Sequence, residues 1–408
     1  MKDKNIIMPN IRFNKFKDSW NTQQLLSLVQ HVKSYTITRE KEEFSGSTEY
    51  IHYGDIHRFK RSIITKTLTL PTIREGSYQA LKNGDIVLAD ASEDFKEIAK
   101  PMVLFDTSGR KIVAGLHTIA LRPVSINSLF LYYLLDTSKF HWFTRKTGTG
   151  LKVFGISAKN LLKFSANVPT LEEQKRISLV ILKVDNLITL NENKISDIKK
   201  LKKVVLQITF NQSWRFNGFT LPWEQRKLGA LAEIVRGASP RPIKDPRWFD
   251  DSSSIGWLRI SDVTNQNGRI HYLLQRLSAE GQSKTRVLHE PHLLLSIAAT
   301  VGKPVINYVE TGVHDGFLIF LNPKFNLEFL FQWLEFVRPT WKKYGQPGSQ
   351  INLNSDLVRN KKISIPTHAE QGKIAFVLNG LDNLIVANEK KLDQLKQLKK
   401  YLMQNMFV

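Results

Sequence analysis

The sequence contains no cysteine among its 408 residues. This absence excludes disulfide bonds, zinc sites with thiolate ligands and cysteine nucleophiles, and it is typical of a reducing compartment. No stretch approaches the roughly 20 consecutive apolar residues that a membrane-spanning helix needs. The first ten residues carry only a short apolar patch at 6–8, so we expect no signal peptide and a cytoplasmic protein.

Acidic residues are scarce relative to basic ones. The chain has 37 Asp and Glu against 59 Lys and Arg, which gives a formal net charge of +22. Such a charge predicts a polyanionic partner, and nucleic acid comes first because Lys and Arg release counterions from phosphates. An anionic membrane surface is the second candidate, and a basic protein without such a partner is the third.

Several catalytic motifs are also missing. The sequence has no G-x-x-x-x-G-K-[ST] loop for ATP, no Asn/Asp-Pro-Pro-aromatic loop and no glycine-rich cofactor turn of a DNA methyltransferase. The Glu-Gln-Lys at 173–175 matches only the last part of a Mg²⁺-dependent nuclease motif. His52 and His57 lie near Asp55, but a metal site there is a weak alternative because no His-x₃-His pair is present. We therefore expect no catalytic residue, no metal site and no bound cofactor.

An internal repeat organises the chain. Residues 169–210 and 366–407 are identical at 19 of 42 positions without a gap. The match extends upstream, where Arg-Phe-Asn-Lys-Phe at 12–16 corresponds to Arg-Phe-Asn-Gly-Phe at 215–219. The starts and ends of the two copies match, whereas their middles hardly match. A duplicated frame with two different middles predicts two related domains that present two different recognition surfaces.

The repeated segments predict two long helices. Apolar residues and one asparagine recur at alternating steps of four and three, from Ile177 to Ile198 and from Ile374 to Leu395, which is a heptad seam. At ~1.5 Å per residue each helix is on the order of 55 Å long. We expect the helices to pair as an antiparallel coiled coil. Separate burial of each helix in its own domain is the alternative.

Each seam is interrupted by one asparagine. Asn191 and Asn388 occupy equivalent positions in the repeat, near the middle of each helix. The midpoints of two antiparallel helices meet at a pseudo-twofold axis, so we predict that the two side chains lie near each other there. In that place they would set the register of the helix pair. The alternative is that both asparagines face solvent.

The divergent middles predict mixed α/β structure. Apolar runs at 85–88 and 293–295 predict strands, and aromatic-rich stretches at 128–139 and 327–337 predict helices. The expected fold class is therefore two homologous mixed α/β (α+β) domains separated by two long helices. The expected boundaries are 1–168 for the first domain, 169–211 for the central helix, 212–365 for the second domain and 366–408 for the C-terminal helix.

Each copy has two regions that combine basic residues with flexible backbone. One is a loop near the start of the copy, and the other precedes its long helix. Glycine permits close approach to phosphate, basic side chains neutralise it, and amides can pair with adenine. Solvated turns with incidental charge are the alternative. The predicted DNA-binding residues are Lys33, Arg39, Lys41, Arg145, Lys146, Thr147, Thr149 and Lys152 in copy one, and Arg236, Ser239, Arg241, Lys244, Arg247, Lys342, Lys343, Gln346, Ser349, Gln350 and Asn352 in copy two.

The ordered set of motifs resembles the DNA specificity subunits of type I restriction–modification systems. The likeness rests on Pro-x-x-x-Glu-Gln-x-x-Ile at 169–177 and 366–374, on Gly-Ala-Ser-Pro at 237–240 and on Ile-Gly-Trp-Leu-Arg-Ile-Ser-Asp at 255–262. Asp55 corresponds to Asp262. Copy one departs from the pattern, because Lys-Ser-Tyr-Thr at 33–36 replaces the Gly-x-x-Pro loop.

The resemblance implies two target recognition domains, each reading one half of an interrupted, asymmetric DNA sequence, with the helix pair as spacer. It also implies two modification subunits, which bring S-adenosylmethionine, and restriction subunits, which bring ATP and Mg²⁺. The main alternative is a sequence-specific DNA endonuclease or methyltransferase in one chain, and the missing motifs count against it. A basic coiled-coil scaffold that binds RNA or membrane is a further alternative, and the two non-identical domains count against that.

Overall fold

The computed structural model describes residues 7–59, 62–150, 152–297, 301–344 and 353–408, and of residues 342–344 it describes the backbone alone. The chain divides into two compact units. Unit 1 comprises Met1–Glu192 with Lys390–Val408, and unit 2 comprises Asn193–Glu389. This division cuts both long helices, whereas the sequence analysis treats each helix as a segment of its own.

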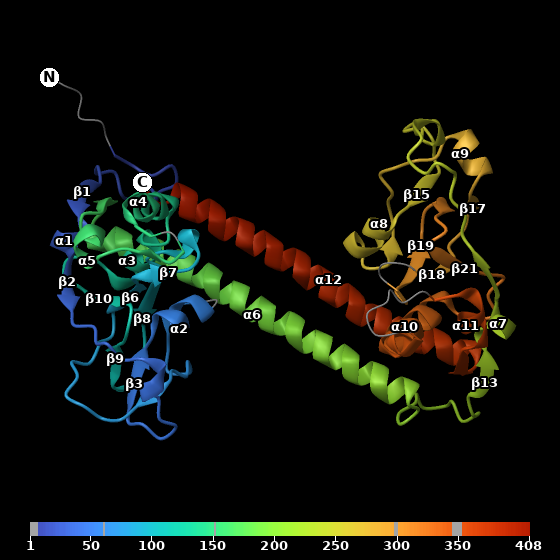
Figure 1. Cartoon of the computed structure of the whole chain (residues 1–408), viewed down its shortest axis with the longest axis horizontal. Helices are drawn as coiled ribbons and strands as arrows, with labels where there is room; N and C mark the ends of the chain where they lie inside the picture. The colour runs from blue at the N-terminus through green and yellow to red at the C-terminus, as the bar shows by residue number, and fades with distance from the viewer. Residues whose placement is uncertain (1–6, 60–61, 151, 298–300, 345–352) are drawn as a thin grey trace. The chain divides into compact units, whose positions relative to one another are not determined.

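Unit 1 is built on a five-stranded sheet (Figure 1). Its order is β2 (Val29–Val32), β10 (Thr118–Pro123), β6 (Ile86–Ala89), β8 (Pro101–Leu104) and β4 (Ile63–Ile64). Ile86 and Leu88 of β6 pack into one hydrophobic core, whereas Val87 and Ala89 pack into another. Because successive side chains of a strand point to opposite faces, both faces of this sheet are buried.

Unit 2 repeats this sheet strand for strand. Its order is β14 (Glu233–Arg236), β21 (Phe317–Leu321), β18 (Leu293–Ser296), β19 (Pro304–Asn307) and β16 (Arg269–Ile270). Leu293 and Leu295 of β18 lie in one core and Leu294 in the other, as in β6 of unit 1. The repeat therefore continues, as fold, through the middles whose sequences hardly match.

A smaller three-stranded sheet differs between the units. In unit 1 its order is β5 (Thr72–Ile73), β3 (Thr48–Ile51) and β9 (Ile112–Ala114). In unit 2 it is β15 (Gly256–Leu258), β20 (Thr311–Val313) and β17 (Arg286–Leu288). The parallel pair β3–β9 corresponds to β15–β20, but the third strand pairs with β3 in unit 1 and with β20 in unit 2. The two units thus share a frame and differ at this sheet.

The remaining elements are short. Those at the start and end of each copy recur in the same order in both units. In unit 1 they are β1 (Asn21–Gln24), α1 (Leu25–Leu28), η1 (Arg39–Lys41), α2 (Tyr53–Arg58), β7 (Ala91–Ser92), η2 (Phe95–Glu97), α3 (Ser128–Leu134), α4 (Ser138–Thr147), β11 (Phe154–Gly155), α5 (Ala158–Leu161) and β12 (Ser165–Val168). In unit 2 they are β13 (Glu224–Lys227), α7 (Leu228–Leu231), η3 (Pro246–Trp248), α8 (Ile260–Asn265), α9 (Ala279–Ser283), α10 (Leu327–Val337), η4 (Arg338–Tyr344), α11 (Ser355–Asn360) and β22 (Lys362–Ile365).

The strands and helices predicted in the middles are largely confirmed. The runs at 85–88 and 293–295 fall on β6 and β18, and the helix predicted at 327–337 is α10. The single helix predicted at 128–139 is wrong, because α3 ends at Leu134 and a new helix begins at Ser138. Thr137 caps that second helix by accepting a hydrogen bond from the backbone N–H of Phe140.

The two long helices are α6 (Leu171–Phe210) and α12 (His368–Asn405). In unit 1, Lys399 pairs with Asp185 at 2.8 Å and Lys396 pairs with Glu192 at 3.3 Å. Moving forward along α6 therefore means moving backward along α12, so the helices run antiparallel in this unit, as predicted. None of the helices formed by the described residues has the length and apolar character to span a membrane.

The same two ion pairs recur in unit 2 with the helices exchanged. Lys202 pairs with Asp382, and Lys199 pairs with Glu389 at 2.7 Å. Each of these residues is 197 positions from its counterpart in unit 1, which is the offset of the sequence repeat. The helices therefore run antiparallel in this unit as well.

Both seam asparagines are buried. The exposed fractions are 5% for Asn191, in unit 1, and 8% for Asn388, in unit 2. The alternative that both face solvent is therefore excluded. Their meeting at a common axis stays a prediction.

Candidate nucleic-acid interface

The repeated Arg and Glu form a buried clamp at the start of each long helix. The guanidinium of Arg12 donates to both carboxylate oxygens of Glu173, at 2.7 and 2.8 Å, and the Glu173 side chain is 1% exposed. Arg215 binds Glu370 in the same way in unit 2, at 3.0 and 2.7 Å. The Glu173 carboxylate is thus engaged in a structural pair, which argues against the nuclease interpretation of 173–175.

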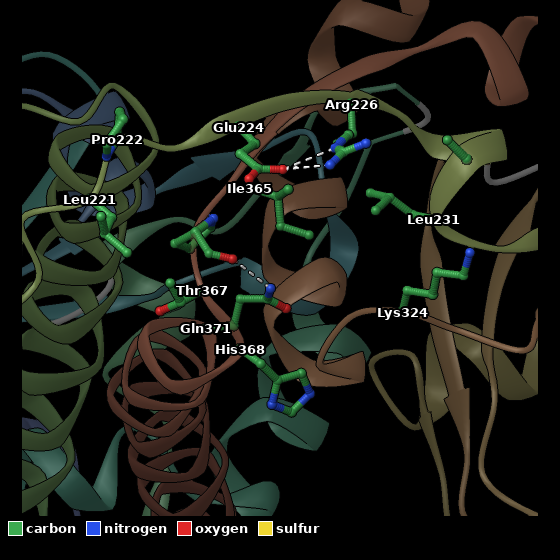
Figure 2. Close-up of a pocket in the computed structure, with 12 residues that line it drawn as sticks. Leu221, Pro222, Glu224, Arg226, Leu231, Lys324, Ile365, Thr367, His368 and Gln371 are labelled. Atoms are coloured by element: carbon green, nitrogen blue, oxygen red, sulfur yellow. Dashed lines mark hydrogen bonds and ion pairs between the residues drawn. The ribbon is translucent and has the colours of Figure 1, made fainter.

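The repeated glutamine ties each long helix to a second helix. The amide of Gln371 donates to the Pro366 carbonyl at 2.8 Å, a bond drawn as a dashed line in Figure 2. It also accepts the backbone N–H of Asn326 at 2.8 Å. Asn326 in turn caps α10. Gln174 makes the same two bonds in unit 1, to Pro169 and Asn127. The Pro-x-x-x-Glu-Gln motif therefore ties the start of each long helix to the domain beside it.

The Gly-x-x-Pro loop of unit 2 has a steric basis. A Cβ atom on Gly237 would lie 2.3 Å from the His314 carbonyl oxygen, so only glycine fits there. The backbone N–H groups of Gly237 and Ala238 donate to the carbonyls of Phe317 and Val313, at 2.9 and 3.0 Å. The loop is thereby fixed against the end of β20 and the start of β21.

Three predicted DNA-binding residues of this loop converge on Asp315. Ser239 and Arg241 donate to its carboxylate at 3.0 and 2.6 Å, and Arg236 donates to its backbone carbonyl at 2.7 Å. Partial burial opposes ionisation of Asp315, but the Ser239 hydrogen bond and the charges of Arg241 and Arg236 lower its pKa. The carboxylate thus stays charged and holds the loop in one conformation.

The other two basic residues of the loop differ in their contacts. Arg247 stacks on Trp248 at 4.1 Å and pairs with Asp245 at 3.2 Å and with Glu280 at 3.7 Å. Lys244 is exposed and has no carboxylate partner among the described residues. Lys244 is therefore freer than Arg247 to meet a phosphate.

Strand pairing confirms which part of copy one corresponds to this loop. Tyr35 donates its backbone N–H to the Ala114 carbonyl at 2.9 Å, as Ala238 does to Val313 in unit 2. Lys33 lies over the Tyr35 ring at 5.1 Å, and Lys41 is exposed.

Arg39 pairs with Glu42 at 2.7 Å and with buried Asp55 at 2.9 Å. Partial burial disfavours its charged form, but these two hydrogen bonds raise the pKa of Arg39. Arg39 thus resembles the Asp315-bound arginines of unit 2 in being held by its own domain.

The second predicted region lies at the end of α4 in unit 1. Arg145, Lys146 and Lys152 are exposed, and Lys146 lies 5.1 Å from the centroid of the exposed Trp142 ring. The Thr147 hydroxyl donates to the Phe143 carbonyl at 2.8 Å, so it is engaged within the helix.

Thr149 of this region pairs with Gly155 through backbone hydrogen bonds at 2.9 and 2.8 Å. In unit 2, Lys342 and Lys343 belong to η4, where only the backbone is described. Gln346, Ser349, Gln350 and Asn352 lie outside the described residues. The predicted contacts of this region in unit 2 therefore stay predictions.

Asp55 and Asp262 occupy equivalent places and have the same role. Asp55 accepts the backbone N–H of His52 at 3.1 Å at the start of α2, and Asp262 accepts that of Arg259 at 2.9 Å at the start of α8. His57 is bound to Glu97 at 2.9 Å and to a backbone carbonyl. Within the described ranges, no group of three His, Cys, Asp or Glu side chains is placed to hold a metal ion.

Sequence reasoning missed the residues that surround the loop of unit 2. His314, Arg259 and Gln275 line an open pocket of about 650 Å³ together with Lys244 of the loop. They come from three separate stretches of sequence, so only the Trp-Leu-Arg motif at 257–259 hinted at one of them.

This architecture defines a two-domain recognition protein, with a duplicated frame and two different surfaces. The family model described as "Type I restriction modification DNA specificity domain" matches residues 17–200 and 221–397. A type I restriction enzyme MjaVIII specificity subunit of Methanocaldococcus jannaschii is 24% identical over 425 aligned residues, which cover 95% of this chain and 91% of that protein.

Solved structures show the same fold at low sequence identity. The S subunit of a type I restriction–modification system from M. genitalium matches with a TM-score of 0.64 and 15% identity, over 98% of this chain and 99% of that one. A chain from a structural study of complex assembly in a type I system matches with a TM-score of 0.52 and 15% identity, over 94% of this chain and 96% of that one.

The chain belongs to the type I restriction–modification DNA specificity family. Its function is that of a specificity subunit, the non-catalytic DNA-recognition component of such a system. The predicted family, fold class and function are confirmed, and the alternatives of a single-chain enzyme and of a coiled-coil scaffold are set aside.

Proposed function

We propose that this specificity subunit reads a bipartite DNA target, with one half-site for each unit. The observation that supports this most directly is the duplicated five-stranded sheet, whose attached three-stranded sheets differ in the position of the third strand. Two copies of one frame place two readers in equivalent settings, and the differing sheet and loops give each reader its own surface. An asymmetric, interrupted target follows.

We assign the phosphate contacts first to exposed basic side chains without a carboxylate partner among the described residues. Among the predicted DNA-binding residues, those that also lack an aromatic partner are Lys41, Arg145 and Lys152 in unit 1 and Lys244 in unit 2. A phosphate contact needs a free cation, because an ion pair within the domain already neutralises the charge. Arg39 and Arg241 then act mainly by holding their loops.

We also propose that two modification subunits dock on two equivalent apolar patches. Leu179 and Leu187 of α6 are 49% and 46% exposed, and their counterparts Phe376 and Leu384 of α12 are 81% and 50% exposed. Each pair is eight residues apart in a helix, so both members lie toward the same face. Large exposed apolar side chains mark interaction surfaces. Because the two patches occupy equivalent positions in the repeat, each can bind one copy of the same partner.

The cofactors would be carried by the partners. S-adenosylmethionine belongs on the modification subunits, and ATP and Mg²⁺ belong on restriction subunits where these are present. The site of action would be the cytoplasm, where the target DNA is.

Reconstitution tests this proposal. The chain is purified alone and together with modification subunits, and each sample is incubated with plasmid, Mg²⁺, ATP and S-adenosylmethionine. The chain alone should neither cut nor methylate, whereas the complex should methylate adenine within one interrupted motif. Methylation without an interrupted motif, or activity of the chain alone, would contradict the proposal.

A further inference from the structure

The pocket beside the Gly-x-x-Pro loop of unit 2 combines an apolar wall with a polar rim. Trp257 and Phe249 line it, together with Lys244, Arg259, Gln275 and His314, and its volume is about 650 Å³. Trp257 itself is 2% exposed, so the wall is fixed by the core. A recess with aromatic walls and a few polar groups has the chemistry of a site for a planar polar group.

The hydrogen bonds of His314 define which of its ring nitrogens is free. Its Nδ1 accepts the backbone N–H of Gly316 at 2.8 Å. The Asp315 carboxylate also lies 3.0 Å from Nδ1, but it is occupied by Ser239 and Arg241. A neutral imidazole that accepts at Nδ1 carries its proton at Nε2.

The electrostatic surroundings keep this ring neutral. Burial lowers the pKa of His314; the nearby Asp315 carboxylate opposes this shift, and Arg241 and Arg236 add to it. His314 therefore offers an N–H donor in place of a charge, and its orientation is set by Gly316.

Arg259 and Gln275 complete the polar rim. The Arg259 side chain is 44% exposed and reaches Asp262 only at 3.5 Å, so its fork of N–H donors is available. The backbone carbonyl of Gln275 accepts the N–H of Trp257 at 2.7 Å, which fixes its place, and no hydrogen bond of its side-chain amide is found within the described ranges. Apart from that amide oxygen, the polar groups named here are all donors.

We propose that this pocket receives the major-groove edge of one guanine in the half-site of unit 2, with Arg259 and His314 donating to it. This inference rests on the proposed function and names the residues that carry its specificity. The guanine edge presents two acceptors, N7 and O6, whereas adenine presents one acceptor and one donor. A rim of donors therefore matches guanine. Arg236 and Arg241, which are committed to Asp315, only position the loop.

The test uses the complex of the full chain with its modification subunits, and it determines the methylated motif by sequencing. Arg259→Lys keeps the positive charge but loses the planar fork, so a phosphate contact would survive, whereas the two-point contact with guanine would be weakened. His314→Asn keeps an acceptor near the Gly316 N–H but loses the Nε2 donor. The matched control is His289→Asn, which changes an exposed histidine outside the pocket.

We expect both pocket variants to lose discrimination at the same single position of one half-site, by about tenfold or more, since a good bidentate pair discriminates by ~1–3 kcal/mol. The other half-site and the control should be unchanged, and thermal melting should show that the variants are folded. An unchanged motif, or a uniform loss of affinity at every sequence, would overturn the guanine pocket while leaving the proposed function intact. Failure of the unsubstituted complex to methylate an interrupted motif would instead refute the proposed function.

Discussion

The clamp between Arg12 and Glu173 leads to the sharpest stability prediction. Two charge-assisted hydrogen bonds of 2.7 and 2.8 Å join these side chains, and Glu173 is 1% exposed. In Arg12→Met the methionine fills much of the same space, but it leaves the Glu173 carboxylate buried without its cation. Removing one partner of a buried pair costs about 3–5 kcal/mol of stability.

The double variant Arg12→Met with Glu173→Met separates the charge from the packing. It replaces both partners by apolar side chains, so most of the lost stability should return. The matched control is Arg226→Met, which breaks a pair whose members, Arg226 and Glu224, are 55% and 67% exposed. Exposed pairs contribute about 0–1 kcal/mol, so this control should change the free energy of unfolding very little.

Hydrogen exchange measured by mass spectrometry reports the loss locally. Peptides from the start of α6 should lose protection in Arg12→Met, whereas peptides from the start of α12 in the same sample should keep it. The contrast follows because Glu173 and Glu370 are clamped by different arginines. A loss below about 1 kcal/mol, or a double variant no more stable than the single one, would refute the assignment of a buried, charge-dependent clamp.

Four further outcomes are expected. Binding of the assembled complex to its target should weaken by a factor on the order of 10³ or more between about 50 and 200 mM salt, and a flat response would contradict phosphate contact. Exchanging residues 20–165 for those of a relative should change one half-site of the methylated motif, and a change in both would contradict separate readers. The double variant Asn191→Leu with Asn388→Leu should raise the melting temperature, because both sites are buried. It should also allow a wider range of spacer lengths between the two half-sites of the methylated motif, and an unchanged spacer length would count against a register role. Gly237→Ala should cost ~1–3 kcal/mol of stability, because the new Cβ atom would lie 2.3 Å from the His314 carbonyl oxygen. It should also weaken recognition of the half-site read by unit 2, and an unchanged methylated motif would show that the loop adapts.

The repeated framework explains why the two domains can diverge so far. The clamp, the glutamine bonds and the ion pairs between α6 and α12 use residues that the sequence repeat retains. The differing loops follow strands β2 and β14, which hold equivalent places in the two five-stranded sheets. Specificity can therefore change in one unit without a change in the frame.

The sequence by itself determined the duplication, the two long helices and the basic character of the chain. A heptad pattern depends only on residues close together in the sequence, so it predicts a helix directly. The repeat follows from comparing two segments of the sequence, and the net charge follows from counting charged residues. Motif positions also indicated the family, although the role of Glu173 and Gln174 as a clamp and a tie was not visible. Their partners, Arg12 and Asn127, are far away in sequence.

Only the tertiary structure decided which predicted contact residues are free. Arg236, Ser239 and Arg241 carry the right chemistry for DNA, but Asp315 lies 74 or more positions further along the chain and binds all three. The same folding brings Arg259, Gln275 and His314 around one pocket from three separate stretches. Composition and spacing indicate which interactions a side chain is able to make. Its actual hydrogen-bond and ion-pair partners depend on which distant segments the fold brings next to it.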